Sequence, residues 1–208
     1  MKIGIIGSGV VGTTLAKAVL RSGNEVILCN SRSPETLKDL ITELGPGAYA
    51  GTKEETASQE IVILAVWWDS IRNVLTGLPN WNGRILIDAT NQLHVTCKGI
   101  EPVRTEPLTG SEVVASLACG ANVIKAFNSL YADFMDGASS LGRRVLFYAG
   151  DDDAAKQTAA DLFTDMQFYP VDVGRLSSGG RLMQAGGVLS GTHFIQPEEG
   201  NIHFNHNM

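Results

Sequence analysis

The sequence has few charged residues, few cysteines and no long hydrophobic run, and each shortage excludes a class of protein. Charged side chains make up 18% of the 208 residues, and the net charge of −6 comes with no basic stripe, which argues against a nucleic-acid partner. The three cysteines, Cys29, Cys97 and Cys119, are widely spaced and odd in number, so we expect free thiols and a cytoplasmic location. The longest apolar run, residues 61–68, is too short to span a bilayer, and a strand is expected from residue 2, so we expect neither a membrane segment nor a signal peptide.

The sequence also lacks a recognisable catalytic or metal-binding set. The acidic run at residues 151–153 suits the first turn of a helix, where carboxylates complement the helix dipole. His203 and His206 have no further ligand residues nearby, so we expect no metal. His94 is expected on a loop, where a surface position is a commoner role than proton donation. The pattern therefore names no catalytic residue.

What the chain does contain is a glycine fingerprint at its start. Ile3, Ile5 and Ile6 predict a short buried parallel strand, and a helical apolar pattern covers residues 13–21. Between them lies G-x-G-x-x-G, whose glycines allow a tight turn, close approach to a pyrophosphate and close packing of the helix on the strand. Free amides and the dipole at the helix start favour phosphate, whereas the alternative is a glycine-rich turn without a ligand. We expect the phosphates to contact Gly7, Ser8, Gly9, Val10, Val11 and Gly12.

The end of the second expected strand, residues 25–30, bears on which dinucleotide binds. Enzymes that use NAD usually place an acidic residue here to hold the ribose hydroxyls. This chain instead has Asn30, Ser31 and Arg32, which offer hydroxyl and guanidinium groups suited to a 2′-phosphate. We therefore expect NADP(H) to bind at these three residues. The alternative is that Arg32 is only solvated and that Ser33 only caps the next helix.

Strands and helices alternate through most of the chain, which predicts an α/β fold with a doubly wound, mostly parallel Rossmann sheet. We expect a dinucleotide-binding domain at residues 1–172 and a small C-terminal helix and tail at residues 173–208, which could serve the acceptor site or a dimer. Further strands are expected at residues 48–51, 61–66, 85–88, 122–127, 144–149 and 167–171. Helices are expected at residues 34–44, 53–58, 70–76, 109–118, 151–166 and 178–189, and an irregular loop at residues 95–109.

Ligands in such sheets bind beyond the carboxyl ends of the strands. Trp67 and Trp68 follow the strand at residues 61–66, where the indoles either form a wall of the ligand site or pack in the core. Asp69 is expected to cap the next helix. Small and amide residues follow the next strand at residues 89–92, where they could meet a nicotinamide and its ribose.

An ordered set of short motifs supports a family resemblance. The glycine fingerprint and Asn30-Ser31-Arg32 are followed by Ala65-Val66-Trp67-Trp68, Asp88-Ala89-Thr90-Asn91, and the segments at residues 123–128, 149–153 and 172–174. Over about residues 1–190 the chain resembles the NADP-dependent reductases of coenzyme F420 and their bacterial relatives. The cytosolic domain of the six-transmembrane metalloreductases is also similar.

The resemblance implies that hydride passes directly between NADP(H) and a deazaflavin or flavin ring. Two positions depart from the family pattern: Trp67 stands where many relatives have proline, and Gln92 follows Asn91 where they have an Asn-Pro pair. Both lie near the expected acceptor, so the resemblance supports the family's cofactor for this chain better than it supports the family's acceptor. By matching positions, the residues that line the nicotinamide are Ala65, Val66, Trp67, Trp68, Ala89, Thr90, Asn91, Ala126 and Asn128.

Three functions compete. The leading one is an oxidoreductase that transfers hydride between NADPH and a flavin-like or F420 acceptor; such a reaction needs positioning more than acid–base groups. The second is an NADPH-binding sensor or regulatory protein without turnover. The third is a small imine or carbonyl reductase, which resembles the pyrroline-carboxylate reductases in its N-terminal half. We expect a small-molecule partner and a homodimer.

Overall fold

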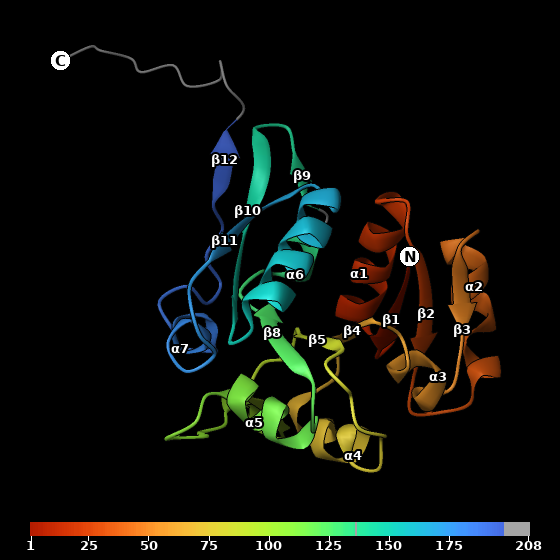
Figure 1. Cartoon of the computed structure of the whole chain (residues 1–208), viewed down its shortest axis with the longest axis horizontal. Coiled ribbons are helices and arrows are strands. Elements are labelled where there is room, and N and C mark those ends of the chain that lie inside the picture. Colours follow the sequence, from red (N-terminus) through yellow and green to blue (C-terminus); the bar gives the residue numbers. More distant parts are fainter. Residues whose placement is uncertain (136, 198–208) are drawn as a thin grey trace.

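The computed structural model describes residues 1–135 and 137–197, so His203, His206 and the rest of the tail lie outside the described residues. Its centre is a sheet with the strand order β11-β10-β8-β5-β4-β1-β2-β3 (Figure 1). The path from β3 to β8 is parallel throughout, whereas β10 and its parallel neighbour β11 run in the opposite direction. The strands of this path are β1 (Lys2–Ile6), β2 (Glu25–Cys29), β3 (Ala48–Ala50), β4 (Ile61–Leu64), β5 (Ile85–Asp88), β8 (Asn122–Ala126), β10 (Gly142–Gly150) and β11 (Phe168–Asp172).

Helices cover both faces of this sheet, as the doubly wound prediction requires. Successive strand residues point to opposite faces, so Ile61 and Ile63 join one apolar core while Val62 and Leu64 join the other. The first core lies under α1 (Val10–Arg21), α2 (Lys38–Leu44) and α6 (Asp153–Asp165), and the second under α3 (Lys53–Ala57), α4 (Ile71–Leu75) and α5 (Gly110–Leu117). Figure 1 shows α1 and α6 well separated from α4 and α5. Continuous apolar strands therefore become a sheet that is buried on both faces.

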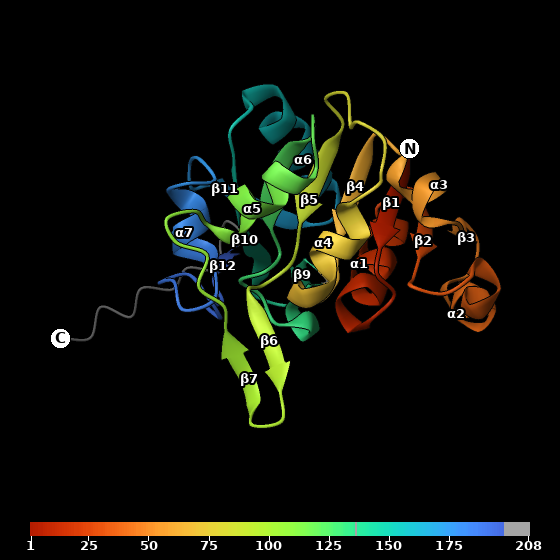
Figure 2. The ribbon, with the colours of Figure 1, turned by 90° about the horizontal axis from the view of Figure 1, so that it is seen from below.

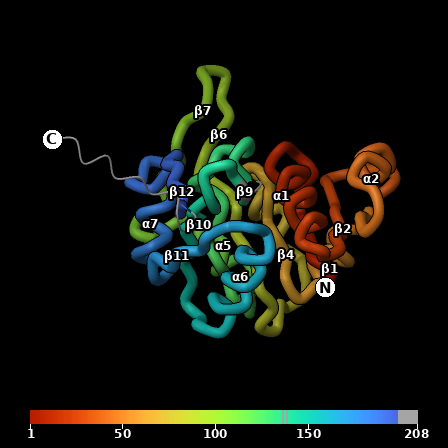
Figure 3. Tube along the Cα trace, turned by 90° about the horizontal axis from the view of Figure 1, so that it is seen from above, coloured from red at the N-terminus to blue at the C-terminus, as the bar shows by residue number. Residues whose placement is uncertain are grey.

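The loop expected at residues 95–109 is wrong in part, because a β-hairpin occupies its first half. β6 (Leu93–Thr96) pairs antiparallel with β7 (Gly99–Pro102), so His94 lies on a strand rather than on a loop. Gly99, with φ of +123°, allows the tight turn, and the Thr96 hydroxyl accepts a bond from the Lys98 amide. Figures 2 and 3 show the hairpin projecting from the body of the molecule.

The last helix is shorter than the expected range of residues 178–189. α7 covers only Gly179–Met183, because Gln184 adopts an extended backbone and Gly186 has φ of +85°. The chain then turns back and adds β12 (Ile195–Pro197), which pairs antiparallel with β10, as does β9 (Ala138–Ser139). Among the described residues, no helix is both long and apolar enough to cross a membrane.

Two helix starts that look alike in sequence differ in the structure. Thr52 forms a complete capping box with Glu55 at the start of α3. Ser33 precedes the 3-10 turn Pro34–Leu37, and among the described residues its side chain makes no capping bond. We expect Thr52→Ala to lower the free energy of unfolding by about 1 kcal/mol and Ser33→Ala to change it by less than about half of that. Urea denaturation of both variants measures this, and equal losses would contradict the assignment.

Candidate functional site

The site residues expected from the sequence lie just after one of five strands, β1, β2, β4, β5 or β8, except Ala126, which is the last residue of β8. These strands run parallel, so their carboxyl ends share one edge of the sheet. The structure therefore brings the five groups to the same edge, where an open α/β sheet offers a ligand crevice.

The glycine turn between β1 and α1 is packed at two of its glycines and open at the third. A Cβ on Gly7, whose φ is +114°, would lie 2.1 Å from the Ala65 carbonyl oxygen, and a Cβ on Gly12 would lie 2.0 Å from the Gly7 carbonyl oxygen. A Cβ on Gly9 would meet no atom of the described residues within 4 Å. The first intrahelical bond runs from the Thr13 amide to the Gly9 carbonyl (2.9 Å), which leaves the preceding amides for an outside acceptor. The turn is thus open to an anion at Gly9.

After β2, one of the three expected residues builds the turn and two are exposed. Asn30 accepts a bond from the Arg32 amide (2.8 Å) and donates one to the Thr36 hydroxyl (3.0 Å). Ser31 and Arg32 are exposed, and within the described part of the chain the Arg32 guanidinium has no hydrogen-bond or ion-pair partner. Asn30 therefore shapes the loop, while a hydroxyl and a cation are available to a ligand.

After β4, the two indoles have different surroundings. Trp67 is 59% exposed, whereas Trp68 packs, together with Val66, against the core on the α5 side of the sheet. Asp69 does not cap a helix as expected, because Ser70 precedes α4 and the Asp69 carboxylate contacts His94 Nδ1 at the base of the hairpin. An exposed aromatic surface therefore lies beside an Asp–His pair at this strand exit.

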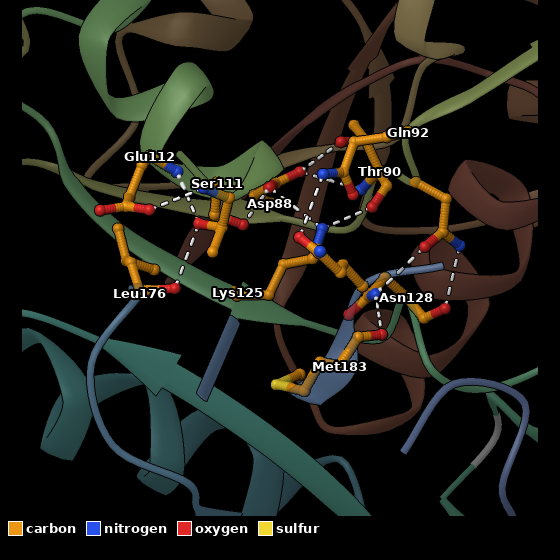
Figure 4. A network of polar contacts seen from close by, with 12 residues as sticks. Asp88, Thr90, Gln92, Ser111, Glu112, Lys125, Asn128, Leu176 and Met183 are labelled. Atoms are coloured by element: carbon orange, nitrogen blue, oxygen red, sulfur yellow. Dashed lines mark hydrogen bonds and ion pairs between the residues drawn. The ribbon is translucent and has the colours of Figure 1, made fainter. Parts of the chain in front are cut away.

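After β5 and β8, the two expected amide side chains bind each other. Asn91 Nδ2 donates to the Asn128 carbonyl (3.0 Å), and Asn128 Nδ2 donates to Asn91 Oδ1 (3.1 Å) and to the Met183 carbonyl (2.8 Å). Asn128 Oδ1 and the neighbouring Ser129 hydroxyl are buried, and neither has a hydrogen-bond partner within residues 1–135 and 137–197. These contacts join two strand exits and α7 into one wall, as Figure 4 shows around Asn128 and Met183.

The sequence reasoning missed a buried charge pair directly behind this wall (Figure 4). Lys125 Nζ lies 3.1 Å from Asp88 Oδ2, which also accepts a bond from the Ser111 hydroxyl (2.6 Å). Burial lowers the pKa of Lys125 from its usual value, against the opposing effect of the Asp88 charge. Asp88 ends a buried apolar strand and Lys125 interrupts another, and a charge in such a run is the signal that could have identified the pair.

Gln92, one of the two departures from the family pattern, is buried in the structure. Its Nε2 donates to the Thr105 hydroxyl and to Gln184 Oε1, both at 3.1 Å. It therefore links the β5 exit to the segment after the hairpin and to the C-terminal segment. A proline at this position could make neither bond.

The described residues, 1–135 and 137–197, contain no group of three or more His, Cys, Asp or Glu side chains placed to hold a metal ion. Asp69, five residues after the last residue of β4, forms an exposed pair with His94. The arrangement is suited to hold an elongated, phosphate-bearing ligand along the sheet edge.

Comparison with known proteins finds similarity to NADP-dependent oxidoreductases. Residues 2–92 match the family model described as NADP oxidoreductase, coenzyme F420-dependent. The metalloreductase STEAP3 of Rattus norvegicus is 29% identical over 181 residues, which cover 85% of this chain and 34% of that protein. The chain thus spans about a third of the length of the curated relatives that it matches.

Solved structures agree with the architecture. The protein SMa0349 of Sinorhizobium meliloti is 32% identical, with a TM-score of 0.87 over 94% of this chain and 96% of that one. A protein of Arthrobacter sp. FB24 described as an F420-dependent NADP reductase is 25% identical, with a TM-score of 0.68 over 85% and 86% of the two chains. An imine reductase of Aspergillus terreus, solved with NADPH4, shares the fold alone at 18% identity and a TM-score of 0.63, over 85% of this chain and 56% of that one.

Proposed function

The chain belongs to the family of coenzyme F420-dependent NADP oxidoreductases, and from this premise we propose that it binds NADP(H) along the sheet edge and transfers a hydride to or from a flat redox acceptor. One observation carries the proposal: the open turn at Gly9 lies at the same edge as the exposed Ser31 and Arg32. Helix-start amides suit the pyrophosphate, and a hydroxyl with an unengaged guanidinium suits a 2′-phosphate.

The remaining strand exits would hold the nicotinamide end. In the proposal, residues after β4, β5 and β8 line the ring, which supplies or accepts the hydride when it is bound. Trp67 presents an exposed indole there, which suits stacking by a flavin or deazaflavin ring. The departures from the family pattern, Trp67 and Gln92, fall at the proposed acceptor end, so the family resemblance supports the cofactor more than the acceptor.

The direct test mixes the purified chain with NADPH and, in turn, FMN, FAD or coenzyme F420 without oxygen, and follows NADPH absorbance. We expect oxidation of NADPH with at least one of these acceptors. Tight NADPH binding without turnover would favour the sensor function, and turnover only with a cyclic imine would favour the imine reductase. Absence of NADPH binding would contradict the proposal altogether.

We further propose the division into residues 1–172 and 173–208, with the second part closing the acceptor site or forming a homodimer. In its described portion, α7 accepts the bond from Asn128 at the Met183 carbonyl, which supports a role at the site. Leu182 and Val188 are 41% and 74% exposed, which supports a contact with a second chain. Light scattering tests the dimer.

The free thiols of Cys29, Cys97 and Cys119 are consistent with a cytoplasmic location, which remains a proposal.

A further inference from the structure

The buried pair of Asp88 and Lys125 has a geometry that stability alone does not explain. The two residues are register partners on the parallel strands β5 and β8, so their side chains lie beside each other on the α5 face of the sheet. The side chains are 3% exposed for Lys125 and 0% exposed for Asp88. Burying two charges is costly, and an apolar pair of similar volume is often as stable or more stable.

What the pair holds is the backbone at the exit of β5. Asp88 Oδ1 accepts bonds from the Thr90 amide (2.9 Å) and from the Thr90 hydroxyl (2.6 Å), and Lys125 Nζ donates to the Thr90 carbonyl. All the hydrogen-bonding groups of Thr90 are therefore bound to one ion pair (Figure 4). The pair is itself tied to α5 through the Ser111 hydroxyl.

The constraint continues to the facing strand exit. Asn91 follows Thr90 directly and exchanges two hydrogen bonds with Asn128, which lies three residues after Lys125. Phe127, between Lys125 and Asn128 in the chain, adopts φ of +65°. This backbone conformation is uncommon for a bulky residue, so surrounding contacts must hold it. The same ion pair thus anchors both loops that face the proposed nicotinamide end.

We propose that Asp88 and Lys125 are positioning residues for the nicotinamide half of the dinucleotide. They act through Thr90, Asn91 and Asn128, because their own side chains are buried and do not face the crevice. The adenine half binds at β1 and β2 in the proposed function, on which this inference rests, so the pair influences that half little. Loss of the pair therefore weakens contacts to one end of the ligand selectively.

The test compares NADPH with 2′-phospho-ADP-ribose, which lacks the nicotinamide ring. In the double variant Asp88→Asn/Lys125→Met, which removes both charges but keeps the volume, we expect NADPH affinity to fall about tenfold, as for the loss of one or two hydrogen bonds. The affinity for the fragment should stay within about twofold of wild type. Isothermal titration calorimetry measures both, and thermal unfolding monitors the fold.

A matched control is Lys156→Met, which removes another lysine in an ion pair, with Asp153 and Asp172. That pair lies where β10 and β11 end, and these strands run opposite to β8, so it is at the other edge of the sheet from the proposed crevice. It should leave both affinities unchanged. If the double variant does not fold, Ser111→Ala removes one donor to Asp88 and should weaken NADPH alone by about threefold. Equal losses for both ligands, or no loss for either, would overturn the positioning role. Wild-type protein that binds neither ligand would overturn the proposed function as well.

Discussion

Gly9→Ala is expected to abolish most NADPH binding while leaving the fold intact. In the part of the chain that the structure describes, the new methyl group meets no atom within 4 Å, so it projects into the space where the proposed pyrophosphate lies. The Gly9 backbone, with φ of −77°, accommodates alanine, so the free energy of unfolding should change by less than about 1 kcal/mol. We expect affinity for NADPH to fall by about 100-fold, measured by calorimetry.

Gly12→Ala is the matched comparison for this variant. The Cβ that this variant adds at position 12 would lie 2.0 Å from the Gly7 carbonyl oxygen, so the helix and the strand must separate. We expect the free energy of unfolding to fall by about 2 kcal/mol. Binding should be lost together with stability in this variant, whereas the two separate in Gly9→Ala. Full retention of NADPH binding by Gly9→Ala would show that no phosphate lies at this turn.

Arg32→Glu is expected to reverse the preference for the phosphorylated cofactor. The variant replaces an exposed cation with an anion, which repels a 2′-phosphate but can accept bonds from unmodified ribose hydroxyls. We expect NADPH affinity to fall about 100-fold and NADH affinity to stay the same or rise, because charge-assisted bonds to phosphate are replaced by repulsion.

Lys98→Glu makes the same charge change at the turn of the hairpin and serves as the control for long-range electrostatics. It should alter both affinities by less than about twofold at physiological salt, where charges far apart are screened. Equal effects of the two substitutions would indicate that Arg32 acts only through net charge. An unchanged ratio of NADPH to NADH affinity in Arg32→Glu would exclude a 2′-phosphate contact at this residue.

The sequence predicted the sheet well because its signals there are local and strong. Residues 61–64 form a continuous apolar run, which is the pattern of a strand buried on both faces, and the structure confirms it. The glycine spacing likewise predicted a strand-turn-helix, and Gly7 and Gly12 are packed as that spacing requires. Where a pattern reflects contacts within one strand-helix unit, the sequence is sufficient to predict the local structure.

The misses depend on contacts between distant segments. The hairpin is not evident from the sequence because Pro102 and Pro107 are residues that interrupt regular structure, although Val95 and Ile100 alternate with polar residues around the turn. The last helix was predicted too long because its apolar residues continue past Gly186, where positive φ ends any helix. The pairing of Asp88 with Lys125 joins residues 37 apart in the chain, so only the parallel register of β5 and β8 reveals it.

The most direct measurement of the central claim is a calorimetric titration of the unmodified chain with NADPH and NADH under the same conditions. Binding of NADPH at least about tenfold tighter than that of NADH would support a 2′-phosphate held at Ser31 and Arg32. No heat with either nucleotide, or tighter binding of NADH, would contradict the proposed function.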